Sequence, residues 1–334
     1  MKIFITGVAG FLGSHLADLM LSGGHTVAGN DNMIGGYADN VPQGVEFHQV
    51  DCCDLENLTK AMEGCDIVYH TAATAYEGLS VFSPVLVTRN IFEASVTTIT
   101  AAIRNNVKRI VYCSSMARYG HHDKMPYRED YECRPQDPYG IAKKAGEDVL
   151  KNLCETHGVE YVIAVPHNIV GPRQKYDDPF RNVMSIMLNR MLQGKQPIIY
   201  GDGEQQRCFS YIDDCLYCLN ALAFQEDVVG EVVNIGPDEE SCTINDLAEM
   251  CANETGLNLD VLYHKDRPQE VKIAVCSSDK ARKLLGYKTS TNVRQSVQKT
   301  AEYIRTRGTK KFQYHLPLEI INDKTPDTWK NKLI

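Results

Sequence analysis

The sequence predicts an α/β fold in which a doubly wound parallel sheet carries a smaller C-terminal α/β lobe. Over residues 1–165, short β-rich runs alternate with amphipathic segments, which is the pattern of right-handed strand-helix-strand units. After Pro166 this alternation fades, and loops rich in Gly, Pro and Asp separate the remaining helical segments. We therefore expect a first domain over residues 1–165 and a second lobe over residues 166–334, with some segments of the second half returning to the sheet.

The strands of the first half are predicted from short runs rich in β-branched and aromatic residues. Several of these runs are almost entirely apolar, as expected of strands that helices cover on both faces of a sheet. They lie at residues 2–6, 25–30, 45–50, 65–70, 107–114 and 159–165. Apolar residues at helical spacing predict helices between them, at residues 11–21, 55–62, 90–104 and 139–156.

The second half is predicted to consist of helices joined by longer loops. The helices lie at residues 182–192, 213–223, 243–255 and 292–306. We expect this lobe to lie over the C-terminal edge of the sheet, where open α/β folds bind ligands. The tail at residues 309–334 is polar and interrupted by proline, and we assign it no function.

Composition and charge exclude several classes of protein. The net charge of −8 over 334 residues argues against binding to nucleic acid, which requires basic clusters. The twelve cysteines are scattered, with Cys215 and Cys218 as the only CxxC pair, so we expect reduced thiols and no metal site. Since there is no apolar run of 18 residues and no signal-peptide pattern, we expect a soluble cytoplasmic protein that does not enter a membrane.

A glycine-rich turn follows the first predicted strand and opens the first predicted helix. Gly7, Gly10 and Gly13 would keep the turn tight, let the main chain approach a pyrophosphate and let the helix pack on the strand. Asp31 ends the second strand, 24 residues after Gly7, where its carboxylate can accept both hydroxyls of an adenosine ribose and repel a 2′-phosphate. The pattern predicts a Rossmann-type domain that binds NAD rather than NADP.

Tyr139 and Lys143 lie four residues apart, on one face of a helix that begins near Pro138. A free phenol, with a pKa of about 10, is a poor base at neutral pH. A nearby ammonium and a positive nicotinamide ring would lower that pKa. Ser115 ends a predicted strand and would reach the same substrate oxygen. Together these residues predict a centre that oxidises an alcohol by hydride transfer.

These motifs, in this order, resemble the extended short-chain dehydrogenase/reductase family, and within it the NAD-dependent nucleotide-sugar epimerases and dehydratases similar to UDP-glucose 4-epimerase. The resemblance runs from Met1 to about Arg307. It rests on TGVAGFLGSH at residues 6–15, VYHTAA at 68–73, CSSMARYG at 113–120, DPYGIAKKAGE at 137–147, HNIVGPRQ at 167–174, IIYGDGEQQRCFSYIDD at 198–214 and RPQEV at 267–271.

The resemblance implies a catalytic set, a cofactor site and a substrate site. The catalytic residues would be Ser115, Tyr139 and Lys143. The residues implied to bind NAD are Gly7, Gly10, Phe11, Leu12, Gly13, Asp31, Asn32, Asp51, Cys52, Ala72, Ala73, Asn90, Tyr139 and Lys143. The residues implied to bind a nucleotide sugar, with a UDP sugar favoured, are Ser115, Asn168, Asn182, Arg207, Arg267 and Ala274. The family also implies a homodimer that pairs through the helices at residues 90–104 and 139–156.

Met116 and Ala117 follow Ser115 at positions where dehydratases of this family carry an Asp-Glu pair and decarboxylases carry a glutamate in the second place. Neither side chain can transfer a proton. We therefore expect the minimal chemistry, in which C4 is oxidised, the sugar ring rotates and hydride returns to the opposite face, giving C4 epimerisation. A 4,6-dehydratase with another acid such as Glu129, a 4-ketoreductase that consumes external cofactor, and an NAD-binding regulator without turnover stay open as alternatives.

Further residues refine these expectations. Ala274 lies seven residues after the second diphosphate arginine, where relatives restricted to glucose carry a tyrosine, which implies room for a 2-acetamido group. Residues 165–167 depart from the family pattern close to the expected nicotinamide. Arg173 and Arg181 are interpreted as solvated surface charges and are given no role in the site.

Overall fold

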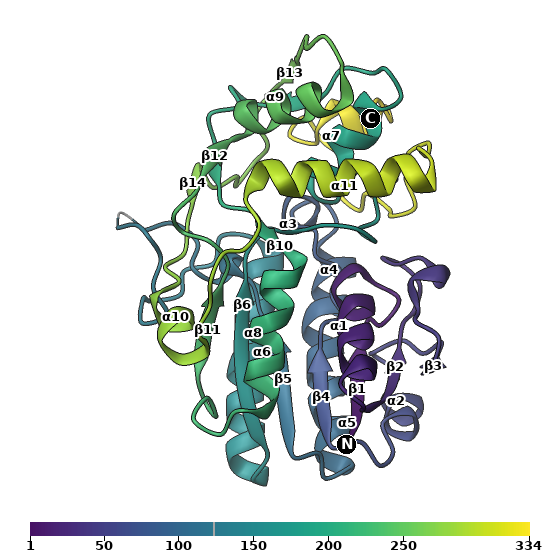
Figure 1. The fold of residues 1–334 in the computed structure, drawn as a ribbon, viewed down its shortest axis with the longest axis vertical. Helices are drawn as coiled ribbons and strands as arrows, with labels where there is room; N and C mark the ends of the chain where they lie inside the picture. The colour runs from purple at the N-terminus through teal and green to yellow at the C-terminus, as the bar shows by residue number, and fades with distance from the viewer. Residues whose placement is uncertain (123) are drawn as a thin grey trace.

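The computed structural model describes residues 1–122 and 124–334. Its centre is a parallel seven-stranded sheet, which confirms the predicted doubly wound α/β fold (Figure 1). In spatial order the strands are β11 (Val232–Ile235), β6 (Glu160–Pro166), β5 (Arg109–Cys113), β4 (Ile67–His70), β1 (Lys2–Thr6), β2 (Thr26–Asn30) and β3 (Val45–His48). The strand order reverses beside β1, between β4 and β2, and such a switch point is where open parallel sheets bind ligands.

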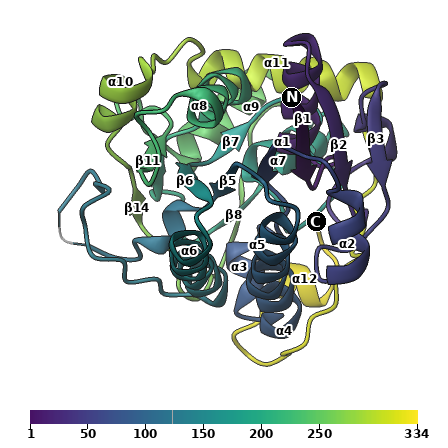
Figure 2. The ribbon, with the colours of Figure 1, turned by 90° about the horizontal axis from the view of Figure 1, so that it is seen from below.

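Helices cover both faces of the sheet, as Figure 2 shows from below. Ile3 and Ile5 of β1 point to the face covered by α1 (Phe11–Ser22) and α8 (Ile212–Phe224), whereas Phe4 points to the opposite face. That opposite face carries α2 (Leu55–Ala61), α5 (Ala94–Arg104) and α6 (Pro138–His157). The predicted helix at residues 90–104 is α5 together with a wider π-helical turn, Arg89–Glu93, that follows α4 (Pro84–Thr88).

The second lobe lies above the C-terminal ends of the strands (Figure 1). Its helices are α7 (Val183–Met191), α9 (Ile244–Thr255) and α11 (Val293–Arg307), and their apolar faces form one core. Thr243 and Asn292 begin α9 and α11 as capping boxes with Asp246 and Gln295, which fixes where these helices start. The smaller elements are β7 (Ile169–Val170), β8 (Ile198–Tyr200), β9 (Gln206–Arg207), β10 (Ser210–Tyr211), β12 (Cys242–Thr243), β13 (Leu262–His264), β14 (Ile273–Ala274), α10 (Asp279–Leu285) and the 3₁₀ turns Ala38–Asn40 and Met116–Arg118.

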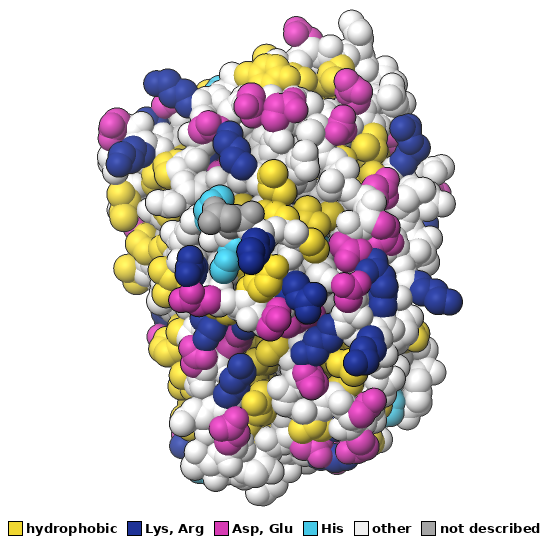
Figure 3. Space-filling view, turned by 90° about the vertical axis from the view of Figure 1, so that its left-hand side faces the viewer, with side chains coloured by type: hydrophobic (Ala, Val, Ile, Leu, Met, Phe, Trp, Pro, Cys, Tyr) yellow, Lys and Arg dark blue, Asp and Glu magenta, His cyan; other side chains and the backbone are white. Residues whose placement is uncertain are grey.

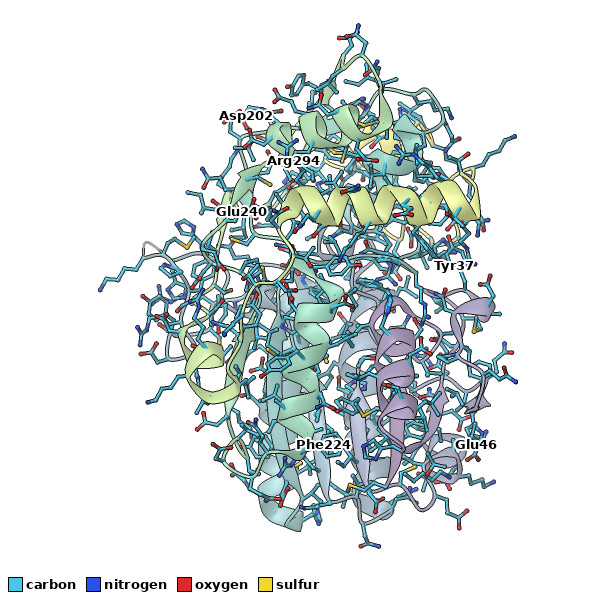
Figure 4. All side chains as sticks on the ribbon, viewed as in Figure 1. Tyr37, Glu46, Asp202, Phe224, Glu240 and Arg294 are labelled. Carbon is cyan, nitrogen blue, oxygen red and sulfur yellow. The ribbon has the colours of Figure 1, made fainter. Side chains whose placement is uncertain are left out.

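The loop after β2 joins the two lobes. Tyr37, which Figure 4 labels at the junction, donates its hydroxyl hydrogen to Asp177 of the second lobe at 2.6 Å. The ammonium of Lys310 and the guanidinium of Arg307 lie over its ring, 3.8 and 4.6 Å from the centroid. These contacts hold the loop at residues 33–37 against the second lobe.

The tail, to which the sequence analysis assigned no function, packs beside α4, on the side of the molecule opposite α1 and α8 (Figure 2). Its short helix α12 (Asp327–Lys330) buries Trp329, whose ring meets Phe82 and Phe180 edge-on with centroids 6.0 and 5.2 Å apart. The carboxylate of Glu319 accepts hydrogen bonds from the first amides of α4, and the main chain at Glu319 donates to Phe82. The tail thus fastens α3 (Glu77–Ser80) and α4 to the second lobe.

The outer surface shows no segregation of charge on the face drawn in Figure 3, where acidic and basic side chains are interspersed. Within residues 1–122 and 124–334, no helix is both long and apolar enough to cross a membrane.

Candidate active site

A cavity of about 470 Å³ lies between the C-terminal edge of the sheet and the second lobe. The structure brings to its wall all but one of the residues that the sequence analysis assigned to catalysis, cofactor and substrate. The exception is Ala274, which borders a recess of about 30 Å³ that shares Glu77, Met116, Asn168 and Arg207 with the main cavity.

The glycine-rich turn has the close packing that a dinucleotide-binding turn requires. Gly7 adopts φ +72°, which favours glycine, and a Cβ there would lie 2.9 Å from Cα of Ala72. The Gly10 amide donates to the Gly7 carbonyl at 2.9 Å, and a Cβ on Gly13 would overlap that same carbonyl. Helix α1 then begins at Phe11 without a side-chain cap, so that its first N–H groups are available to an anion.

Two carboxylates lie at the strand ends beside this turn. Asp31 accepts hydrogen bonds from the amides of Ala9 (3.1 Å) and Met33 (2.7 Å). Burial raises the pKa of Asp31, and these hydrogen bonds act against it. Asp51 accepts from Nδ2 of Asn32 at 3.1 Å; burial acts to raise its pKa, but hydrogen bonds from Cys53 and Asn32 outweigh burial and lower the pKa of Asp51.

The residues present fit a dinucleotide such as NAD. The turn leaves main-chain N–H groups free for a pyrophosphate, and Asp31 offers acceptor oxygens to ribose hydroxyls. Within the described chain, the buried Nδ2 of Asn90 has no hydrogen-bond partner and belongs to the same wall. An orphaned buried donor at this position is what a bound polar group would satisfy.

The start of α6 carries Tyr139 and Lys143 into the cavity. Asp137 caps the helix by accepting from the Gly140 amide at 2.9 Å, and Pro138 occupies the first helical position. Nζ of Lys143 donates to the Cys113 carbonyl at 2.7 Å, and burial lowers the pKa of Lys143 to about 8. Lys143 therefore loses its charge much more easily than an exposed lysine.

The pKa of Tyr139 differs from the direction predicted from its spacing to Lys143. Burial raises the pKa of Tyr139, and the nearby carboxyls of Glu77 and Asp137 act in the same direction, whereas a hydrogen bond with Ser115 opposes them. Protein groups alone thus do not produce the predicted lowering, because burial outweighs them. A positive nicotinamide ring beside the phenol would supply charge of the required sign.

The far end of the cavity is lined by charged side chains from separate loops. Arg267 forms two hydrogen bonds with the carboxylate of Glu270, at 3.0 and 2.9 Å, and lies over the ring of Tyr200. Nη2 of Arg207 is 3.7 Å from the same carboxylate. Asn182 caps α7 by accepting from the Met184 amide at 3.0 Å. The two arginines are thus held side by side, in a geometry suited to a diphosphate.

Glu77 is a carboxylate at this end that the sequence analysis missed. It follows Tyr76 at the start of α3, its side chain is exposed at the wall of the cavity, and it also lines the recess beside Met116. Burial by the surrounding walls and the charge of Asp137 raise the pKa of Glu77 to about 7, against the pull of Arg207 and Arg267. The only signal in the sequence was an acid within the otherwise uncharged stretch at residues 71–80.

The structure also places Glu129, Arg173 and Arg181, on which the sequence analysis stated expectations. Glu129, the acid named for a dehydratase, accepts from the Asn234 amide at 2.9 Å and does not line the cavity. Arg173 forms an ion pair with Asp18 at 2.6 Å and is partly exposed. Arg181 was also interpreted as a surface charge, but this was wrong: it lines the cavity, and only 19% of its side chain is exposed.

The fold and cavity define a Rossmann-type protein of the short-chain dehydrogenase/reductase class, with a dinucleotide turn and a Ser-Tyr-Lys set at one wall. Residues 3–236 match the model of the NAD dependent epimerase/dehydratase family. Since this match spans more than half of the chain, the protein belongs to that family, whose members depend on NAD.

Three solved structures illustrate the similarity. A UDP-glucose 4-epimerase with UDP-glucose from Thermotoga maritima is 29% identical, with a TM-score of 0.86 over 92% of this chain and 99% of its own. A UDP-glucose 4-epimerase complex with NAD from Thermus thermophilus is 28% identical, with a TM-score of 0.85 over 91% and 99%. A UDP-N-acetylglucosamine 4-epimerase from Methanobrevibacter ruminantium is 29% identical, with a TM-score of 0.84 over 92% and 99%.

Proposed function

We propose that this protein is an NAD-dependent epimerase that inverts C4 of a UDP sugar through a transient 4-keto sugar. The observation that carries the proposal is that Ser115, Tyr139 and Lys143 face one cavity with the dinucleotide turn, while Met116 lies at the same wall where a dehydratase would need an acid. Hydride transfer at C4 needs only a base and a hydrogen-bond donor from the protein.

The roles of the side chains follow from their chemistry. Tyr139 takes the proton of the C4 hydroxyl, and Ser115 holds the same oxygen by a hydrogen bond. The ammonium of Lys143 stabilises the phenolate of Tyr139. The reversible acceptance of a hydride from C4 is the chemistry that NAD would supply when bound at this wall. The proton then returns from Tyr139 to the oxygen, so that no atom is gained or lost.

Inversion further requires the sugar to turn while its diphosphate stays in place. Arg207 and Arg267 suit this role, because Glu270 holds both guanidiniums in position and their remaining N–H groups can bind a diphosphate. The ring itself would contact smaller groups, among them Asn168, whose Nδ2 is already held by the Cys208 carbonyl at 2.9 Å.

We propose that sugars with a 2-hydroxyl and with a 2-acetamido group are both substrates. The small side chain of Ala274 borders the recess next to the sugar end. Ala274→Tyr would fill that recess, so activity on UDP-N-acetylglucosamine should fall at least tenfold more than activity on UDP-glucose. A wild-type protein that converts UDP-glucose and leaves UDP-N-acetylglucosamine unchanged would contradict this assignment.

The decisive experiment is to incubate the purified protein with UDP-, dTDP- and GDP-sugars and to identify the products by NMR. We expect a C4 epimer of a UDP sugar without added cofactor. Glu77 gives specific support to one second candidate, a nucleotide-sugar 4,6-dehydratase, because a carboxyl with a pKa near 7 could act as the missing acid. A 4-keto-6-deoxy product, which absorbs in alkali, would favour the dehydratase, and Glu77→Gln should then abolish the absorbance.

We also propose a cytoplasmic homodimer. Ile141 on α6 is 53% exposed, so that an apolar side chain projects from one of the helices through which the family is expected to pair. Val85 on α4, a helix that contacts α6, is 72% exposed. All twelve cysteines are free thiols, which suits a reducing compartment. Light scattering after gel filtration should give about twice the mass of one chain, and Ile141→Glu should lower it to one chain.

A further inference from the structure

Arg181 is a cation in the cavity wall whose guanidinium is only partly satisfied by protein groups among the described residues. It precedes Asn182, the cap of α7, and its guanidinium lies over the ring of Tyr76 at 4.6 Å from the centroid. A positive charge just before a helix N-terminus is disfavoured, since the helix dipole is positive there. The placement is favourable only if an anion lies nearby.

Asp178, the protein anion next to Arg181, also accepts hydrogen bonds from other groups. Nε of Arg181 is 3.7 Å from Oδ2 of Asp178. That oxygen accepts from the Tyr76 hydroxyl at 2.5 Å, and the other oxygen of Asp178 accepts from the Phe180 amide at 2.9 Å. Within residues 1–122 and 124–334, the buried Nε has no hydrogen-bond partner. Protein groups among the described residues thus leave the hydrogen-bonding capacity of the guanidinium incompletely satisfied.

The contacts of Arg181 locate it at the cofactor end. Nη2 donates to the Gly35 carbonyl at 3.4 Å, and a Cβ on Gly35 would overlap that nitrogen. The adjoining Gly36 packs on the glycine-rich turn, with its Cβ position 2.9 Å from the Gly10 amide nitrogen. The charge of Arg181 also acts to lower the pKa of Asp31 and of Tyr139. It thus lies between the residue that suits the adenosine ribose and the residue that suits the reacting end.

The other basic residues that line the cavity form contacts away from the glycine-rich turn. Lys143, Arg207 and Arg267 are, with Arg181, the basic residues among the described residues that line the cavity. Lys143 is bound to the Cys113 carbonyl beside Tyr139, and the two other arginines share Glu270 at the opposite end. The glycine-rich turn and the start of α1 contain no basic residue.

We propose that Arg181 binds the pyrophosphate of NAD from the second lobe, opposite the glycine-rich turn, and so retains the cofactor between catalytic cycles. The proposal rests on the NAD-dependent function proposed above. It makes cofactor retention depend on a residue outside the dinucleotide motif. An epimerase gains from such retention, because the same NAD must remain in place for hydride to return to the sugar.

The test compares wild-type protein with Arg181→Gln, Arg181→Lys and the control Arg173→Gln, each purified with the cofactor that it carries. NAD per chain is measured after gel filtration, and the rate of NAD release is measured after dilution. We expect Arg181→Gln to release NAD at least tenfold faster, as for the loss of a hydrogen bond to a charged group, Arg181→Lys to be intermediate, and Arg173→Gln to match wild type.

Two additional measurements keep the result interpretable. The affinity of the NAD-loaded proteins for UDP, measured by calorimetry, should stay within about threefold of wild type in Arg181→Gln. The melting temperature without NAD separates a folding defect from a binding defect. The proposal is overturned if Arg181→Gln retains NAD as wild type does, if UDP binding weakens more than NAD binding, or if the NAD-dependent rise in melting temperature is unchanged. A wild-type protein that neither carries nor binds NAD would instead overturn the proposed function itself.

Discussion

The two ends of the cavity are built in different ways. At the cofactor end, the wall is mainly main chain: the turn from Gly7 to Gly13 and the ends of neighbouring parallel strands. At the substrate end, the wall consists of charged side chains from loops far apart in the chain, namely Glu77, Arg207, Arg267 and Glu270. The first end depends on backbone shape and the second on a balance of charges.

This difference determines how each end responds to substitution. A turn made of main chain keeps its shape when neighbouring side chains change, as long as the glycines remain. A network of buried charges responds to each member, because removing one partner leaves another uncompensated. We therefore expect a substitution at one end to change the binding or chemistry of that end and to leave the other end unchanged.

Tyr139→Phe should have the largest effect, because it removes the proposed base and leaves the shape of the cavity. We expect kcat to fall about 10³-fold, within the usual range for general acid–base catalysis. NAD content per chain should equal that of wild type. Tyr119→Phe is the matched control, since its hydroxyl donates to Asn234 at 2.8 Å and does not line the cavity. Turnover that survives in Tyr139→Phe would show that another group is the base.

Arg267→Met tests the substrate end. Loss of a guanidinium that binds a diphosphate should raise KM about 10- to 100-fold, with kcat changed much less. NAD retention should not change, because Arg267 belongs to the opposite end from the glycine-rich turn. Arg305→Met is a suitable control, since Arg305 pairs with Glu254 on the surface at 2.6 Å. Loss of NAD from Arg267→Met would show that the two ends are not independent.

The pH dependence of turnover tests the state of Lys143. Because burial favours the neutral amine, the pKa of Lys143 lies at about 8, below that of an exposed lysine. The ammonium is therefore present below pH 8 and lost above it, so kcat should fall about tenfold per pH unit on the alkaline side. Lys143→Arg keeps its charge at all these pH values and should flatten this limb, even if its absolute rate is lower. An alkaline limb that persists in Lys143→Arg would assign the titration to another group.

Glu77→Gln should have the smallest effect on the proposed epimerase. Since the pKa of Glu77 lies at about 7, its carboxyl group is mostly neutral below pH 7 and mostly ionised above it. Once ionised, it offsets the positive charge of Arg207 and Arg267, and KM should rise about threefold from pH 6 to pH 8. Glu77→Gln should show no such rise. Loss of kcat rather than a change of KM would assign Glu77 to the chemistry.

The sequence predicted the cofactor end much better than the substrate end. The four helices predicted in the second half begin and end within one residue of α7, α8, α9 and α11, because apolar spacing and caps such as Thr243 are local signals, whereas the short helices α10 and α12 were not predicted. The glycine-rich turn and the spacing of Tyr139 and Lys143 are local as well. Arg181, Glu77 and the tail were missed, because their environment is set by contacts between residues that are far apart in the sequence.

The raised pKa of Tyr139 illustrates the same limit. Spacing brings Lys143 near Tyr139, but it does not reveal that the Cys113 carbonyl holds the ammonium or that Glu77 lies nearby. Both facts depend on how β5 and α3 meet α6, which appears only in the folded chain.

The route of the tail has a practical consequence for handling the protein. Ile334 forms part of the cavity wall, and its amide is held by the Tyr314 hydroxyl at 2.9 Å. A purification tag fused there would emerge beside the cavity proposed to bind the sugar nucleotide. Met1 is 51% exposed and lies at the opposite end of the molecule (Figure 1). An affinity tag placed before Met1 should therefore leave the cavity undisturbed.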